Sequence, residues 1–229
     1  MALIAHTAQA LPDETLDQLR SAVAMATRPD RLGGRNPYHY TFWYALGTPP
    51  RNLVETAVRD HLVRHIPARV REAAAGVEWW LGRLTSPYAS NFEFGLHRDI
   101  GEDPGTGELV SPTLSSVMYL NDVADGPLLV FGSEPSPDAD DREFVLPAEN
   151  LYVTFPGHLW HAVGSRADVG LPREAPAAPE PRERLTVLVN WWTYQPGDIA
   201  AEPMKQVAAA YDGSMYPELR AGAASQISS

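Results

Sequence analysis

Two histidines and one aspartate stand out as possible ligands of a single metal ion. His97 and Asp99 stand at the end of an alternating segment, residues 91–97, and His161 lies in a later apolar segment, residues 160–163. Two imidazole nitrogens and one carboxylate can hold one face of an Fe(II) ion and leave the opposite positions open for reactants. This donor set favours an oxygenase.

The spacing of these residues decides which of them can share an ion. Side chains two residues apart on a strand point to the same face, so His97 and Asp99 can reach one metal together. A lone His-x-Asp pair is a weak signal, because short motifs often match by chance. His158, in the turn before the apolar segment, is the alternative to His161. We favour His161 because the strand continues beyond it and would hold it rigidly.

An arginine and a threonine on a still later strand could bind an organic acid beside the metal. Arg184 and Thr186 share one strand face, which continues through Leu188, Asn190 and Trp192. The guanidinium can make a forked ion pair with a carboxylate, and the threonine hydroxyl can add a hydrogen bond. Arg182 is the alternative for the arginine.

The elements that must position these residues begin with two predicted helices. Residues 11–26 carry an apolar stripe at helical spacing, with Asp13 as the expected N-cap. Thr48, Pro49 and Pro50 are expected to begin a second helix, which stops near Pro67. Between the helices, the aromatic run 37–44 could be a strand or the wall of a pocket.

From residue 77 onward, short β-like runs alternate with turn residues. Eight strands are predicted, at residues 77–84, 91–97, 113–120, 128–131, 143–146, 151–155, 160–163 and 185–194. This pattern predicts a mainly β (α+β) fold, a double-sheet jelly roll with the N-terminal helices packed on one sheet. Residues 202–211 could form a last helix. Two long loops, 100–112 and 166–183, are candidates for lids, binding loops or disordered inserts.

The length predicts a single domain over residues 1–229. Within it, residues 1–76 would be a helical support region, 77–195 the jelly-roll catalytic core, and 196–229 a C-terminal helix and tail. The chain has no long apolar run, so we expect no membrane span. Its 229 residues contain no cysteine, which excludes disulfides and thiolate metal sites and fits a cytoplasmic protein.

The net charge of −11 argues against a nucleic-acid partner, because binding phosphates needs a basic surface. A small-molecule substrate is the expected partner, and a local basic pocket on an acidic body stays open. The oligomeric state cannot be read from the sequence.

Four stretches, taken in order, resemble the Fe(II)/2-oxoglutarate-dependent dioxygenases, particularly the prolyl 4-hydroxylase-like branch. The resemblance covers roughly residues 77–195. The stretches are FGLHRD (94–99), SVMYLND (116–122) with DGP (125–127), LYVTFPG (151–157) with HAV (161–163), and RLT (184–186) running to the tryptophans at 191 and 192.

The resemblance implies the jelly-roll fold and a set of cofactor roles. His97, Asp99 and His161 would bind Fe(II), Arg184 and Thr186 would take the distal carboxylate of 2-oxoglutarate, and Tyr119 would hydrogen-bond that same carboxylate. O2 would be the second co-substrate, and succinate and CO2 would be released. Related halogenases lack the carboxylate ligand, so the aspartate favours hydroxylation or another oxidation. The leading hypothesis is hydroxylation of an unactivated C–H in a small molecule, such as an amino acid or a biosynthetic intermediate.

Two features depart from the family pattern. The arginine follows His161 by 23 residues, about twice the usual interval, and an inserted Pro- and Ala-rich loop would account for the excess. Gly126-Pro127 stands where relatives commonly have two glycines.

Other functions stay open. A prolyl or peptidyl hydroxylase is a variant within the same superfamily. A cupin-like metal protein without redox chemistry would share the jelly roll, but cupins usually carry His-x-His with a Glu and a later His. His61 and His65 lie four residues apart on the second predicted helix, but the glutamate of a metalloprotease motif is missing. We interpret them as part of a solvated basic face.

Overall fold

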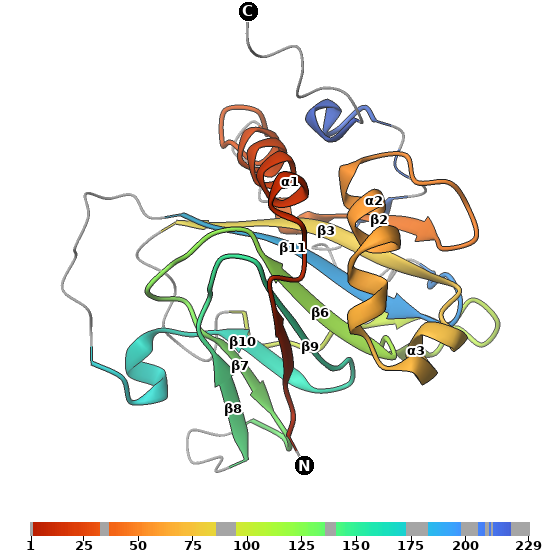
Figure 1. Ribbon diagram of the computed structural model, residues 1–229. Helices are drawn as coiled ribbons and strands as arrows, with labels where there is room; N and C mark the ends of the chain where they lie inside the picture. Colours follow the sequence, from red (N-terminus) through yellow and green to blue (C-terminus); the bar gives the residue numbers. More distant parts are fainter. Residues whose placement is uncertain are drawn as a thin grey trace, which may run out of the picture.

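The computed structural model describes residues 2–32, 37–85, 95–135, 141–172, 183–197, 206–208, 211 and 213–220. Its largest element is a seven-stranded sheet with the strand order β1-β9-β6-β11-β3-β2-β12 (Figure 1). The strands are β1 (Ala5–Ala8), β2 (Tyr40–Ala45), β3 (Gly76–Thr85), β6 (Leu114–Tyr119), β9 (Leu151–Pro156), β11 (Glu183–Trp192) and β12 (Gln206–Ala208).

A three-stranded sheet lies against one face of the larger sheet. It has the order β10-β7-β8, from β7 (Leu128–Phe131), β8 (Arg142–Val145) and β10 (Trp160–Val163). Side chains of β6, β7 and β9 pack together between the sheets, among them Val117, Val130 and Val153. The predicted jelly roll is therefore confirmed, and a short hairpin of β4 (Gly101–Glu102) and β5 (Leu109–Val110) extends from it.

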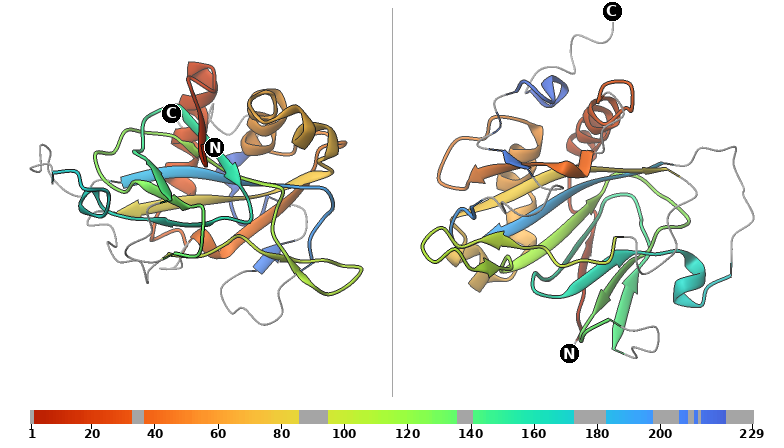
Figure 2. Two further views of the ribbon diagram at one scale, coloured as in Figure 1. Left: turned by 90° about the horizontal axis from the view of Figure 1, so that it is seen from below. Right: turned by 180° about the vertical axis from the view of Figure 1, so that it is seen from behind.

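Helices cover the other face of the large sheet, as expected from the sequence. They are α1 (Asp13–Ala26), α2 (Leu53–Asp60) and α3 (Ala68–Ala73), with short 3-10 turns η1 (Pro37–His39), η2 (Leu62–His65), η3 (Arg166–Val169) and η4 (Pro217–Leu219). Figures 1 and 2 show α1 and α2 on the side away from the three-stranded sheet. Among the residues that the structure describes, no helix combines the length and apolar character needed to cross a membrane.

The two faces of β11 differ in the way that a strand between two layers requires. Leu185, Val187, Val189 and Trp191 belong to the core beneath the helices. The alternate residues, from Arg184 through Thr186 to Asn190, therefore face the interior between the sheets. This alternation brings polar side chains into a buried space.

Several predicted boundaries were wrong. The second helix does not begin at Thr48: its N-cap is Asn52, whose side chain accepts a 3.0 Å hydrogen bond from the Glu55 N–H. Thr48 instead donates its hydroxyl to the Ala45 carbonyl. The helix also ends at Asp60 and gives way to η2 and α3 rather than running on to Pro67.

The helix predicted over residues 202–211 is also wrong where this stretch is described. Gln206–Ala208 is strand β12, and it pairs in parallel with Tyr40–Phe42 of β2. At the other edge, β1 was not predicted, and it pairs with β9. Most of the strand predicted at 91–97 lies outside the described residues. Within it, His97 forms an isolated bridge with His161.

Candidate metal centre

His97 and His161 face each other because their two backbone segments pair at these residues. His97 N–H donates to the His161 carbonyl over 3.0 Å, and His161 N–H donates back over 2.9 Å. Gly95, at φ +78°, makes the turn that leads the chain into this bridge. The two imidazole rings consequently lie side by side, with their centroids 4.3 Å apart.

Asp99 completes a group of three ligand atoms. Its Oδ1 lies 3.8 Å from His97 Nε2, and its Oδ2 lies 3.7 Å from His161 Nε2. Ligand atoms from all three residues lie within 4.8 Å of one another. Two atoms bound to one ion at about 2.1 Å each can be at most about 4.2 Å apart, so the Asp–His spacings suit a shared ion. They are too long for direct hydrogen bonds.

The second nitrogen of each imidazole contacts a carbonyl oxygen. His97 Nδ1 contacts the Gly95 oxygen, and His161 Nδ1 lies 3.1 Å from the Leu159 oxygen. A carbonyl can only accept, so each Nδ1 carries a proton, and Nε2 is the nitrogen of each ring that is placed to bind a metal. Burial, and secondarily the nearby His97, lower the pKa of His161 to about 4, so this ring is neutral at pH 7.

A hydrogen bond from a strand of the larger sheet holds the Asp99 carboxylate in place. Asp99 is 7% exposed, and Ser115 on β6 donates a 2.7 Å hydrogen bond to its Oδ2. Phe155 on β9 lies beside the His161 ring, with centroids 4.9 Å apart. The aromatic ring shields one side of the group from water, whereas His97 stays exposed on the other side. The arrangement is a two-histidine, one-carboxylate face with an open approach.

Arg184, Thr186 and Tyr119 meet on the same interior face. Thr186 on β11 is the direct cross-strand partner of Tyr119 on β6. Arg184 Nη2 donates to the Tyr119 hydroxyl over 3.3 Å, and its guanidinium lies 5.1 Å from the centre of that ring. Arg184 is 2% exposed. A buried guanidinium among hydroxyl groups can bind a carboxylate that brings the opposite charge.

Tyr38 lies close to this group, although the sequence did not single it out. It lies in η1, before β2, and its hydroxyl reaches the neighbourhood of Thr186 and Arg184. The only sequence signal was the aromatic density of residues 37–44, which suggested a strand or a pocket wall. The strand is confirmed, since Tyr40–Ala45 form β2, and Tyr38 lies just before it. Ser115 was likewise not predicted, and no local pattern marks it.

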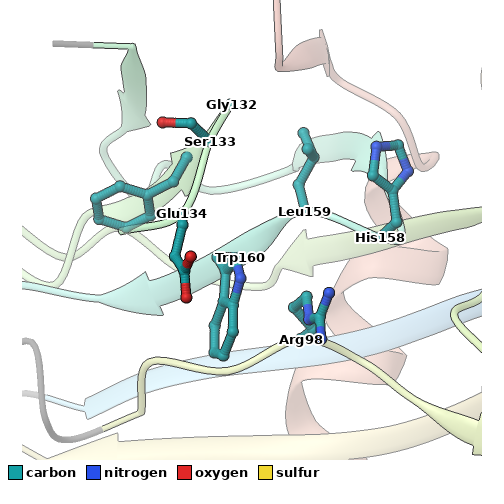
Figure 3. A pocket seen from close by; sticks show the side chains of 8 residues that line it. Arg98, Gly132, Ser133, Glu134, His158, Leu159 and Trp160 are labelled. Atoms are coloured by element: carbon teal, nitrogen blue, oxygen red, sulfur yellow. The ribbon is translucent and has the colours of Figure 1, made fainter. Parts of the chain in front are cut away.

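Other candidate residues lie apart from the three ligands. His158 is exposed and lines a pocket of about 360 Å³ with Arg98 and Trp160 (Figure 3). Arg98 lies over the Trp160 ring, 4.9 Å from its centre, so it points away from its neighbours His97 and Asp99. Arg182 lies outside the described residues.

The His61 and His65 pair does not form a metal site. His61 Nδ1 contacts Arg64, and His65 Nε2 contacts the Ala10 carbonyl oxygen. Within the described parts of the chain, His97, Asp99 and His161 are the one group with the geometry to hold a metal.

Comparison with known proteins shows that the fold of this chain is similar to that of several solved structures. No protein-family model and no curated protein sequence matches the chain. Among solved structures, a prolyl-4-hydroxylase from Pseudomonas putida has a TM-score of 0.50 at 20% identity, covering 84% of this chain and 94% of that one. HygX from Streptomyces hygroscopicus, solved with nickel and 2-oxoglutarate, has a TM-score of 0.48 at 15% identity and 91% coverage of both chains.

A third similar structure is the α-ketoglutarate-dependent carbocyclase SnoK from nogalamycin biosynthesis, with a TM-score of 0.47 at 12% identity. It covers 90% of this chain and 89% of that one. The chain has the double-stranded β-helix fold seen in the prolyl-4-hydroxylase structure. It also carries a His-x-Asp…His group whose ligand atoms all lie within 4.8 Å of one another.

Proposed function

We propose that the protein is an Fe(II)- and 2-oxoglutarate-dependent oxygenase that hydroxylates an unactivated C–H of a small molecule and releases succinate and CO2. One observation carries the proposal. The three-ligand group and the buried Arg184 site open into the same interior of the jelly roll, one beside Ser115 and the other beside Tyr119 of strand β6.

The donor set fits iron. Two neutral imidazoles and one carboxylate suit Fe(II), and three ligands on one side leave positions for a chelating co-substrate and O2. His97, Asp99 and His161 are the proposed ligands. Their Nε2 and carboxylate atoms already face one another, and the carbonyl contacts of both Nδ1 atoms fix the ring orientations. Binding the ion would therefore need little reorganisation.

The second site fits the far carboxylate of 2-oxoglutarate. Arg184 offers a fork of N–H donors, and the hydroxyls of Thr186 and Tyr119 lie beside it. Iron with 2-oxoglutarate and O2 supplies the oxidising chemistry, in which the 2-oxo acid loses CO2. The protein's own task is to hold the carboxylate, orient the ligands and exclude water.

Polar side chains on the interior face of β11 favour the binding of a polar molecule there. Asn190 is 1% exposed, and neither its Oδ1 nor its Nδ2 has a hydrogen-bond partner among the described residues. It is the direct cross-strand neighbour of Ser115, which holds Asp99. Buried amides are rarely left without partners. We therefore propose that water, co-substrate or substrate hydrogen-bonds to the Asn190 amide.

A small substrate is proposed over a peptide because the donor groups converge in a buried interior. Peptidyl hydroxylation is the alternative within the class, and the surface pocket lined by Arg98 and Trp160 is where a longer substrate could extend. Succinate release is measured with free amino acids and with prolyl peptides as substrates. The comparison distinguishes a small-molecule hydroxylase from a peptidyl hydroxylase. A small-molecule enzyme should couple succinate release only to the free compound.

The decisive experiment is anaerobic. Fe(II) is added to the metal-free protein, 2-oxoglutarate is titrated, and the visible metal-to-ligand charge-transfer band is followed. We expect a saturable band that is lost in His97→Ala and weakened in Arg184→Ala. Bound metal with no band at any 2-oxoglutarate concentration would contradict the oxygenase proposal and favour a cupin-like metal protein without redox chemistry.

A further inference from the structure

We propose that Tyr38 is a fourth residue of the carboxylate site and that its phenol donates a hydrogen bond to the distal carboxylate of 2-oxoglutarate. The inference rests on the proposed function and extends it. It gives the N-terminal region a direct part in binding the co-substrate, beyond covering the sheet.

The position of Tyr38 depends on a glycine in the neighbouring strand. Gly82 on β3 is the cross-strand partner of Thr186 on β11. A Cβ atom added at Gly82 would lie 2.2 Å from Thr186 Oγ1 and 2.7 Å from the Tyr38 hydroxyl. The two hydroxyls therefore occupy the space that a side chain at position 82 would take. Tyr38 reaches the interior face through this gap.

The groups around the Tyr38 hydroxyl are those of the carboxylate site. Burial raises the pKa of the Tyr38 phenol, while the Arg184 charge and the Thr186 hydroxyl oppose that shift. The tyrosine therefore stays protonated at neutral pH and can donate. Tyr119 adds to the rise in the pKa of Tyr38, so all three predicted carboxylate-binding residues influence this one hydroxyl.

A carboxylate has enough acceptor capacity for these donors together. Each of its two oxygens has two lone-pair positions, which gives about four sites for hydrogen bonds. The Arg184 fork can fill two of them, and the hydroxyls of Thr186 and Tyr38 can fill others. Because Tyr119 accepts from Arg184 Nη2, it also holds the guanidinium in place.

The test compares two 2-oxo acids. 2-Oxoglutarate carries the distal carboxylate, whereas 2-oxobutyrate has the same chelating end and lacks it. Both are titrated anaerobically into the Fe(II)-loaded protein, and the charge-transfer band gives each Kd without any turnover. The variants are Tyr38→Phe and, as a matched control, Tyr44→Phe, whose hydroxyl donates to the Thr48 carbonyl in the core beneath the helices.

We expect Tyr38→Phe to raise the Kd for 2-oxoglutarate by about tenfold or more, which is typical of losing a hydrogen bond to a charged group. The Kd for 2-oxobutyrate should not change, and Tyr44→Phe should change neither. Gly82→Ala places a methyl group against both hydroxyls. It should also raise the Kd for 2-oxoglutarate and leave the Kd for 2-oxobutyrate unchanged. This second variant tests the site without altering any donor.

Two results would overturn the inference alone. Equal 2-oxoglutarate affinities in the wild type and Tyr38→Phe would remove Tyr38 from the site, and equal weakening of both acids would assign it a merely structural role. A wild-type protein that binds Fe(II) but gives no band with either acid would instead overturn the proposed function, and the inference with it.

Discussion

Ser115 holds Asp99 by a 2.7 Å hydrogen bond from its Oγ to the carboxylate Oδ2, and both residues are buried. The bond ties a loop residue to the rigid strand β6 in the larger sheet. Metal ligands that are fixed by outer hydrogen bonds keep their orientation when the ion is absent. The serine therefore prepares the carboxylate for an ion.

Replacing this serine should weaken metal binding without preventing folding. Ser115→Ala removes the donor, and loss of such an outer contact typically lowers metal affinity by about 10- to 100-fold. Competition with a coloured chelator would measure the change. The control is Ser116→Ala, one residue further along β6, whose hydroxyl bonds Val189, Tyr152 and Trp191 on the helix side. It should lower the melting temperature and leave metal affinity intact.

Replacing His161 and replacing His158 should have different effects on metal binding. His161→Ala removes an Nε2 that faces Asp99, so metal binding should be lost. His158→Ala changes an exposed side chain in the neighbouring pocket and should leave metal binding unchanged. Isothermal titration with Fe(II), kept anaerobic, or with Ni(II) as a stable substitute measures both. Equal losses in the two variants would mean that the three-ligand group is assigned incorrectly.

The long interior strand was the easiest part of the site to predict. In strand β11, apolar side chains at residues 185, 187, 189 and 191 alternate with residues that include Arg184 and Thr186. This period of two places Arg184 and Thr186 on one face without any knowledge of the fold. The choice of His161 over His158 also followed from strand continuity. The structure brings His161, and not His158, to Asp99.

Other features depend on contacts that no local pattern reports. Thr48 and Asn52 are both residues that commonly cap helices, and only the fold decides that Asn52 does so. Residues 206–208 form a strand because β2 offers an unpaired edge, which overrides local propensity. Tyr38 enters the site through the space above Gly82, a relation between residues 44 positions apart.

Replacing Arg184 by lysine tests whether the shape of the guanidinium, and not only its charge, matters for binding 2-oxoglutarate. Arg184→Lys keeps a cation but loses the planar fork that matches a carboxylate, so we expect 2-oxoglutarate to bind about tenfold more weakly. The stabilisation of the Fe(II)-loaded protein by saturating 2-oxoglutarate, seen as a shift in Tm, should shrink accordingly. An unchanged shift would place the carboxylate elsewhere. Arg83→Lys on β3, which alters an ion pair with Glu183, is the matched control.

Asn190 offers a test of whether the interior is shaped for a ligand at the expense of stability. Its amide is 1% exposed, and neither polar atom has a partner among the described residues. Leaving a buried polar group unsatisfied costs about 1–3 kcal/mol, whereas an apolar group of similar shape carries no such cost. Asn190→Leu should therefore leave the metal-free protein at least as stable as the wild type in urea unfolding.

The same substitution should reduce substrate-coupled succinate release, because the leucine cannot complete a polar contact beside Ser115 and Asp99. Fe(II) affinity should stay the same, since Asn190 is not one of the three ligands. A stability loss of several kcal/mol would instead mean that the amide is satisfied in the folded protein and serves the structure. Residues shaped by function often lower stability in this way, because a binding site needs polar groups that the folded chain alone leaves incomplete.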